Sequence, residues 1–456
     1  MARTLFATLA LALCGRAGGS PPGVGPLAAF LRRGTRGGAA EQGPVVLPLV
    51  RRLVEVGSEA DNGTAPMMKS FYVGAVRVGT GGAELGMEVF FDTSSGQVIL
   101  DSVRCEATPC LLHRRYSPTV DLRLDGAHVP EGRRGNRVDI RLDSNDAAPG
   151  RATGDLVRDT LCLGPLVRTA CAQVGLVAAT NLSGGPFDDM PFDGIVGLGL
   201  ESLSIGPEFS LPGRLAKAAG LPSQFALFVG DGAAPEISFG GYNEARLAAP
   251  LSWTPVARPE EGFWQVGISS IRVGGRSLGL CERFSGGCRG VVDSSSANLG
   301  VPSDLMPALL EALAVSSTEG GPCSGAVGPD LHLVLEGGAT LTLGPREYAG
   351  PSARAAGGCG PQLHSVSTES KAAAGRFLHN GTVRRAGGLA ERTLLLGEPL
   401  LRRYYTVFDL GAERIGFGLA APSTLPGLEP TPAAEEPPPQ EDFVLMQTCR
   451  PVPTGP

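Results

Sequence analysis

Short apolar or alternating runs separated by turn residues dominate the chain from Phe71 to about residue 420. A period of two is typical of strands with one buried face, and glycine and proline between the runs favour turns. Helical patterns are limited to PGRLAKAAGL and SDLMPALLEALA. The sequence therefore predicts an all-β protein. The clearest strand patterns are FYVGAVRV, MEVFFDT, VDIRL, EISFGG, LHLVLEGG, TLTLG and YYTVFDL.

Both ends of the chain differ from this central part. An apolar run followed by small residues predicts a secretory signal peptide over residues 1–20. Residues 21–65 are rich in Gly, Ala and Arg apart from VVLPLVRRLVEV, and they predict a processed or loosely ordered leader resembling a prosegment. The proline-rich, acidic residues 421–456 predict a flexible tail. No other segment approaches the ~20 apolar residues of a transmembrane helix, so we expect no transmembrane segment.

Composition narrows the class of protein further. A hydrophobic content of 42% in 456 residues is ample for buried cores. Together, 66 glycines and 38 prolines make up more than a fifth of the chain, which favours many short strands joined by turns. The formal net charge is -6, and no basic block reaches five residues. This pattern excludes the usual electrostatic signature of nucleic-acid binding.

The central part contains an internal repeat. FFDTSSG at residues 90–96 returns as VVDSSSA at residues 291–297, with an aspartate at the same place in each. Gly197 follows Asp92 by 105 residues, and Gly397 follows Asp293 by 104. A single Asp followed by Ser or Thr often only caps a turn. Four elements at one matched spacing instead predict two related β lobes, each presenting one aspartate on a turn after an apolar strand. The predicted lobes are residues 66–250 and 251–420.

Two facing aspartates have a definite chemistry. Like charges so close do not both ionise, so one carboxyl acts as a base and the other as an acid. Water held between Asp92 and Asp293 can then attack a peptide carbonyl without a metal or cofactor. Glycoside hydrolysis is the competing chemistry of paired carboxylates and depends on their separation, which the sequence does not give. Matched turns in duplicated β lobes favour the shared-proton arrangement over a carbohydrate-active or lectin-like protein.

The cysteines and sequons indicate an oxidising compartment. Cys14 belongs to the predicted signal peptide, and Cys449 in the tail is left unpaired. Spacing alone leaves the connectivity of the other eight open. These eight are Cys105, Cys110, Cys162, Cys171, Cys281, Cys288, Cys323 and Cys359. Sequons at Asn62, Asn181 and Asn380 predict glycosylation in the secretory pathway, leading to secretion or to a lysosome- or vacuole-like compartment.

From about Phe71 to Ala420, the order of these landmarks resembles that of the pepsin-like aspartic endopeptidases. FFDTSSGQVIL resembles the first Asp turn of that family, FDGIVGLG its Phe-Asp-Gly segment, and FWQVGISSIRVGG the strand that opens its second lobe. The closest match is LLLGEPLLRRYYTVFDLGAERIGFG. The resemblance implies two pseudo-symmetric β lobes with a substrate cleft between them. It also implies an acid-active monomer that hydrolyses polypeptides.

The resemblance also assigns roles to individual residues. It implies that Asp92 and Asp293 are catalytic and that Thr93 and Ser294 lock the two Asp turns together. It implies that the Ser95 and Ser296 hydroxyls bind the carboxylates. The disulfides that it implies are Cys105–Cys110, Cys281–Cys288 and Cys323–Cys359, with Cys162–Cys171 as an additional bridge.

Three features depart from the family's pattern. Ser94 and Ser295 replace the glycine that follows each Asp-Thr or Asp-Ser pair. A Cβ there is predicted to strain the turns or to move an N–H away from its carboxylate. Leu142 matches the position of the tyrosine in the flap, and the tryptophan after the first Asp turn is replaced within residues 96–100. These departures favour an alternative, a catalytically inactive protein that keeps the fold and binds peptides.

Overall fold

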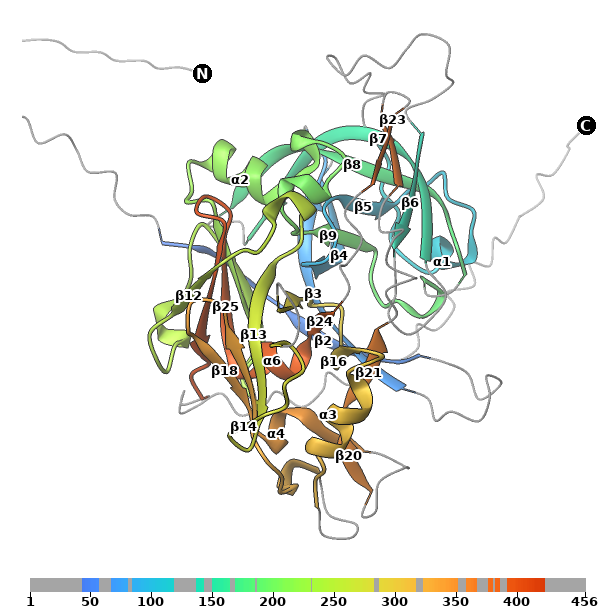
Figure 1. Ribbon diagram of the computed structural model, residues 1–456. Helices are drawn as coiled ribbons and strands as arrows, with labels where there is room; N and C mark the ends of the chain where they lie inside the picture. The colour runs from blue at the N-terminus through green and yellow to red at the C-terminus, as the bar shows by residue number, and fades with distance from the viewer. Residues whose placement is uncertain are drawn as a thin grey trace, which may run out of the picture. The chain divides into compact units, whose positions relative to one another are not determined.

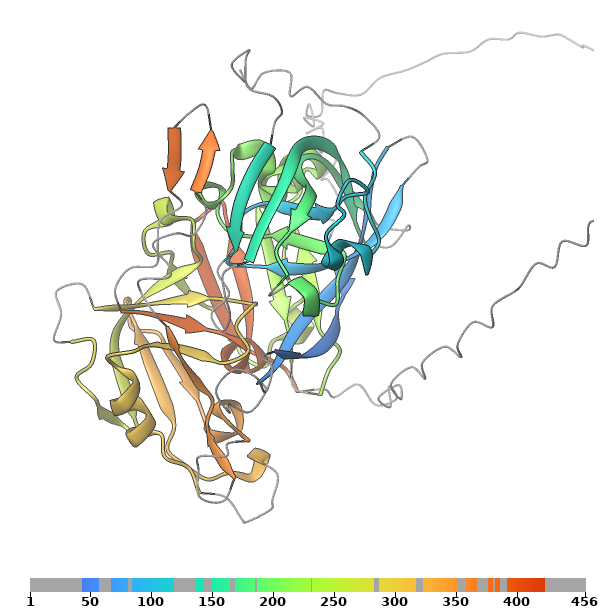
Figure 2. The same cartoon turned by 90° about the vertical axis from the view of Figure 1, so that its right-hand side faces the viewer.

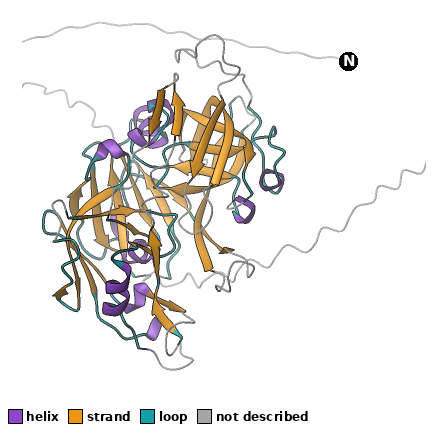
Figure 3. Cartoon of the chain, turned by 45° about the vertical axis from the view of Figure 1, so that its right-hand side comes forward, coloured by secondary structure: helices purple, strands orange, loops and turns teal. Residues whose placement is uncertain are grey.

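Strands dominate the described part of the computed structural model, and its helices are short (Figures 1 and 3). This confirms the predicted all-β class. The described residues are 43–56, 67–80, 84–118, 137–142, 150–164, 169–184, 187–230, 232–282, 287–316, 323–351, 358–366, 376–379, 382–385 and 392–422.

The part of the chain that carries Asp92 forms an eight-stranded sheet with the order β2-β3-β4-β9-β5-β8-β7-β6. The longest strands, β7 and β8, run antiparallel beside each other (Figure 1). β3 also pairs with β7, so the sheet curls back on itself. The strands are β2 (Val50–Val56), β3 (Met67–Val78), β4 (Leu85–Asp92), β5 (Val98–Asp101), β6 (Arg137–Leu142), β7 (Gly150–Leu163), β8 (Ala170–Leu182) and β9 (Gly194–Gly197).

The part that carries Asp293 forms a second eight-stranded sheet, with the order β18-β17-β13-β15-β24-β16-β21 and β14 paired to β13. Its strands are β13 (Gln265–Val273), β14 (Arg276–Ser277), β15 (Cys288–Val292), β16 (Leu299–Pro302), β17 (Leu331–Leu335), β18 (Thr340–Leu343), β21 (Leu363–Val366) and β24 (Thr393–Leu396).

The internal repeat of the sequence corresponds to a repeated arrangement of four strands. In the first sheet, β9 is parallel to β4 and antiparallel to β5, which is itself parallel to β8. In the second, β24 has the same relation to β15 and β16, and β16 is parallel to β21. Asp92 lies opposite Gly197 in this register. A Cβ on Gly397 would clash with the carbonyl oxygen of Ser296, so both glycines allow close approach to an Asp turn.

A third sheet has six strands and contains segments from both ends of the described chain, in the order β1-β11-β10-β25-β26-β12. Aromatic side chains fill its core, where the rings of Phe225 and Phe408 stack with centroids 4.6 Å apart. Figure 2 shows β25 and β26, in red, between strands of the two other sheets. The strands are β1 (Val45–Pro48), β10 (Gln224–Phe228), β11 (Glu236–Phe239), β12 (Ser252–Pro255), β25 (Tyr404–Asp409) and β26 (Arg414–Leu419).

Part of the predicted leader belongs to these sheets. β1 pairs with β11, and β2 pairs with β3. Val45, Leu47 and Leu49 alternate with exposed or partly exposed residues, and all three are buried. Residues 45–56 are therefore not loosely ordered: they form two paired strands, and Val45, Leu47 and Leu49 supply apolar side chains to the core.

The helices of the described residues are few and short. α2 packs on β8 and ends at Gly220, whose φ of 62° suits glycine at a helix C-terminus. No described helix has the length and apolar character needed to cross a bilayer. The helices are α1 (Thr108–Leu111), α2 (Leu211–Ala219), α3 (Met306–Ala312), α4 (Pro345–Tyr348) and α6 (Glu398–Arg403).

Short elements connect the sheets and helices. The 3-10 helices are η1 (Phe187–Asp189), η2 (Glu201–Leu203), η3 (Pro207–Phe209), η4 (Glu244–Arg246), η5 (Pro259–Glu261) and η6 (Cys323–Gly325). Two small hairpins pair β19 (Ala349–Pro351) with β20 (Cys359–Pro361) and β22 (Arg376–His379) with β23 (Thr382–Arg385).

All four disulfides implied by the resemblance are present, with S–S distances between 2.00 and 2.08 Å. The predicted signal peptide, Cys14, Asn62, Asn380 and Cys449 lie outside the described residues, as does most of the predicted tail. The third sequon is described, and Asn181 is exposed near the end of β8.

Candidate active site

Both aspartates lie at the ends of buried strands in matching parts of the two sheets. Asp92 is the last residue of β4, after the buried Phe90 and Phe91. Asp293 follows β15 directly. Their exposed fractions are only 6% and 3%. The apolar strands therefore carry two ionisable side chains to places where water screens little of their charge.

Four hydrogen bonds join the two Asp turns to each other. The Thr93 N–H donates to Ser294 Oγ at 3.1 Å, and the Ser294 N–H donates to Thr93 Oγ1 at 3.0 Å. The Thr93 hydroxyl donates to the Val292 carbonyl oxygen at 2.8 Å, and the Ser294 hydroxyl donates to that of Phe91 at 2.9 Å. Both residues are buried. This reciprocal arrangement is the one that the resemblance implied for Thr93 and Ser294, and it holds the turns side by side.

Each aspartate accepts two hydrogen bonds from the serine two residues further along. Asp92 Oδ1 accepts from the Ser94 N–H at 2.9 Å and from the Ser94 hydroxyl at 2.7 Å. Asp293 Oδ1 accepts from the Ser295 N–H at 2.9 Å and from the Ser295 hydroxyl at 2.6 Å. The serines that replace glycine thus bind the carboxylates directly.

This geometry overturns the expectation that a Cβ strains the turns. Neither Ser94 nor Ser295 is among the residues with positive φ, the region that favours glycine. Both backbone N–H groups still reach the carboxylates. The prediction was wrong because it considered only the steric effect of the added Cβ. The backbone at both serines does not require positive φ, and each hydroxyl points toward its carboxylate.

Ser95 and Ser296 differ in the contact that the resemblance implied: the Ser95 hydroxyl acts on Asp92, whereas the Ser296 hydroxyl is bound elsewhere. The Ser296 hydroxyl donates to the carbonyl oxygen of Asn298 at 3.0 Å, so its one proton is not available to Asp293. Within the described residues, the buried Ser95 hydroxyl makes no hydrogen bond of ordinary geometry, although it lies close enough to lower the pKa of Asp92. The short side-chain bonds to the carboxylates come from Ser94 and Ser295 instead.

Burial raises the pKa of Asp92 above its usual range, and the neighbouring charge of Asp293 raises it further. The hydrogen bonds from Ser94 act in the opposite direction, because they stabilise the ionised carboxylate. The effect of Asp293 on Asp92 supports the prediction that the two carboxyls lie close together.

The other departures from the family's pattern lie at the edge of what the structure describes. Leu142 is the last residue of β6, but neither its side chain nor residues 143–149 are described. β5 spans part of the region where the tryptophan is replaced, and Val98, Ile99 and Leu100 are buried there.

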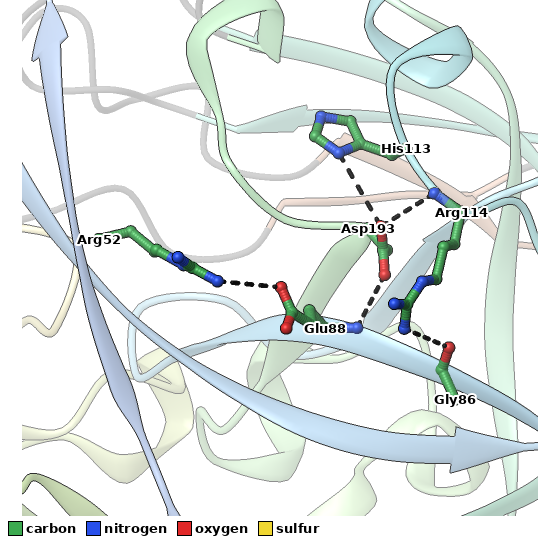
Figure 4. A network of polar contacts seen from close by, with 6 residues as sticks. All are labelled: Arg52, Gly86, Glu88, His113, Arg114 and Asp193. Atoms are coloured by element: carbon green, nitrogen blue, oxygen red, sulfur yellow. Dashed lines mark hydrogen bonds and ion pairs between the residues drawn. The ribbon is translucent and has the colours of Figure 1, made fainter. Parts of the chain in front are cut away.

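A polar network at the start of β9 was not anticipated from the sequence. Figure 4 shows Asp193, just before β9, joining β4 to the loop after α1. Its Oδ2 accepts from the Glu88 N–H at 2.8 Å, and its Oδ1 accepts from the Arg114 N–H at 2.9 Å. His113 Nδ1 lies 3.9 Å from Asp193 Oδ1. The signal in the sequence was the segment FDGIVGLG, whose aspartate is Asp193.

Asp101, the last residue of β5, lies beside this network. It lines a mostly apolar pocket that also contains Phe187 and Phe192, and it is 4% exposed. Burial, followed by the charge of Asp193, raises the pKa of Asp101 from 3.8 to about 7. Among the described residues, no group of three His, Cys, Asp or Glu side chains could hold a metal ion.

We expect Thr93→Val to destabilise the protein by roughly 2–4 kcal/mol. Valine keeps the shape but leaves two buried groups, the Ser294 N–H and the Val292 carbonyl oxygen, without their partner. Free energies of unfolding from urea titration measure the effect, and Thr93→Ser, which keeps the hydroxyl, serves as the control. If Thr93→Val proves as stable as Thr93→Ser, the hydroxyl does not hold the turns together.

The comparisons with known proteins agree with this geometry. A family model described as eukaryotic aspartyl protease matches residues 71–420. Gastricsin from Cavia porcellus is 29% identical over 366 residues, which cover 78% of this chain and 81% of that protein. Human gastricsin is 27% identical, with 78% and 82% covered. Cathepsin E from Oryctolagus cuniculus is 26% identical, with 77% and 81% covered.

Proposed function

Because the chain belongs to the eukaryotic aspartyl protease family, we propose that it is an endopeptidase whose catalytic pair is Asp92 and Asp293. One observation carries the proposal. Two buried aspartates lie on turns that reciprocal hydrogen bonds from Thr93 and Ser294 lock together. A site without chemical function has no need to keep two desolvated carboxyls so close to each other.

The mechanism follows from the shared proton of the pair. One carboxylate takes a proton from a water molecule, and the oxygen of that water attacks the carbonyl carbon of the peptide bond. The other carboxyl gives its proton to the carbonyl oxygen. Collapse of the tetrahedral intermediate then breaks the C–N bond: the carboxyl that took the proton from water gives it to the leaving nitrogen, and the other carboxylate takes its proton back as the carbonyl re-forms. Since two adjacent carboxyls hold one proton only below neutral pH, activity is expected in acid.

A peptide-binding protein without catalysis is the second candidate. It is favoured by the leucine at position 142, where the family's pattern has the tyrosine of the flap. The two candidates share the fold and a polypeptide ligand, and they differ only in whether the bound chain is cut.

Incubation of the full chain with a mixed peptide library at acid pH tests the proposal. Mass spectrometry should detect new termini, and a peptide with a non-cleavable hydroxyl group in place of the scissile amide should suppress them. Binding of library peptides without any cleavage would support the second candidate instead.

We also propose that the protein matures in the secretory pathway, for secretion or for a lysosome- or vacuole-like compartment. Four disulfides support this, because such bridges persist in oxidising compartments. The exposed Asn181 is open to glycosylation. The signal peptide, glycosylation at Asn62 and Asn380, and a monomeric state remain predictions.

A further inference from the structure

The two serines that replace glycine bind the same atom of each aspartate. The hydroxyl and the N–H of Ser94 both donate to Asp92 Oδ1, and those of Ser295 both donate to Asp293 Oδ1. The four distances lie between 2.6 and 2.9 Å, a range typical of hydrogen bonds to a charged acceptor. The same contact occurs on both turns, so the arrangement is symmetric.

These contacts decide where a proton can bind. An ionised carboxylate has about two acceptor positions on each oxygen, and the serine donors occupy both positions of Oδ1. A proton on Oδ1 would have to displace one of these donors. The free acceptor positions of Asp92 and Asp293 are therefore on Oδ2.

We propose that Ser94 and Ser295 are positioning residues of the catalytic pair, whose hydroxyls keep the shared proton on Oδ2 and extend activity to lower pH. The inference rests on the proposed function of Asp92 and Asp293. It reverses the significance of the glycine loss, because the substituted residues support acid–base chemistry instead of blocking it.

The charges around the pair are consistent with this role. Asp293 is the ionisable group that acts on Asp92, and its charge opposes ionisation, as does burial. The donors from Ser94 favour the ionised form and so offset part of this penalty. The neighbouring Ser296 hydroxyl is engaged with Asn298 and offers Asp293 no such donor.

The test is the pH dependence of kcat/KM for Ser94→Ala, Ser295→Ala and the double variant. Alanine removes the hydroxyl and keeps the backbone N–H, so the acid limb of the profile should move up by about one pH unit. Ser94→Thr and Ser295→Thr, which keep a hydroxyl, should restore the original limb. Ser296→Ala should leave the limb where it is. An acid limb that stays in place in the double alanine variant would overturn the proposal.

A second measurement separates failure of this inference from failure of the proposed function. Protein labelled with ¹³C at aspartate carboxyls is titrated by NMR, and the two resonances are assigned from Asp92→Asn and Asp293→Asn. Ser94→Ala should raise the pKa of Asp92 whether or not the protein cuts peptides. Unchanged titration in an active enzyme would overturn the proposed role of the serines and leave the proposed function intact. A shift in an inactive protein would show that the serine hydroxyl lowers the pKa of Asp92, and the inactivity would count against the proposed function.

Discussion

Asp92→Asn and Asp293→Asn are each expected to lower the rate of peptide hydrolysis at acid pH by about 1,000-fold or more. An amide neither takes a proton from water nor gives one to the carbonyl oxygen, so either change removes half of the acid–base pair. Asparagine has nearly the same shape, and its carbonyl oxygen can still accept from Ser94 or Ser295 on its own turn. Initial rates on a peptide identified from the library measure the effect.

The control for these variants is an exposed aspartate. Asp139 pairs with Arg151 at 3.4 Å, and its side chain is 51% exposed. Asp139→Asn should keep the rate of the unmutated protein. Near-UV circular dichroism checks that the two catalytic variants keep the fold. If either variant is folded and cuts peptides at more than about a tenth of the original rate, that aspartate is not half of the pair.

Asp101→Asn should stabilise the protein at neutral pH while changing little near pH 4. In the folded protein, the pKa of Asp101 is raised from 3.8 to about 7. The folded state therefore binds the proton more tightly than the unfolded state, and the resulting stability is lost as pH rises toward 7. A shift of this size corresponds to a loss on the order of 4 kcal/mol. Asparagine carries no charge and avoids the loss.

Urea unfolding from about pH 4 to pH 8 measures this difference. The variant should unfold at the same urea concentration as the original protein in acid and at a higher one near pH 8. Asp139→Asn, at an exposed position, should show no gain at neutral pH. If Asp101→Asn and the original protein lose the same stability between pH 4 and pH 8, groups other than Asp101 cause the pH dependence of stability.

The repeat and the period-two patterns were sufficient to predict the all-β class, the related sheets and the residues of the Asp turns. They were sufficient because each Asp turn is followed, at nearly the same distance along the chain, by a glycine that packs directly on it. The resemblance supplied the four disulfides and the reciprocal contacts of Thr93 and Ser294.

Features that depend on distant partners could not be predicted in the same way. β1 pairs with β11, about 190 residues further along, and no local pattern identifies such a partner. The burial of Asp101 beside Asp193 depends on how two strands and a loop meet. For Ser94, the residue type shows that a hydroxyl is present but not the rotamer that directs this hydroxyl to Asp92 Oδ1.

The pH dependence of kcat/KM tests the central claim most directly, measured between about pH 2 and pH 8 on full chain expressed through a secretory pathway. A shared proton predicts a bell-shaped profile with its maximum in acid, one limb for each ionisation of the pair, and no measurable activity in either Asp→Asn variant. Hydrolysis absent at every pH, or a profile unchanged by both substitutions, would contradict the assignment of Asp92 and Asp293 as an acid–base pair.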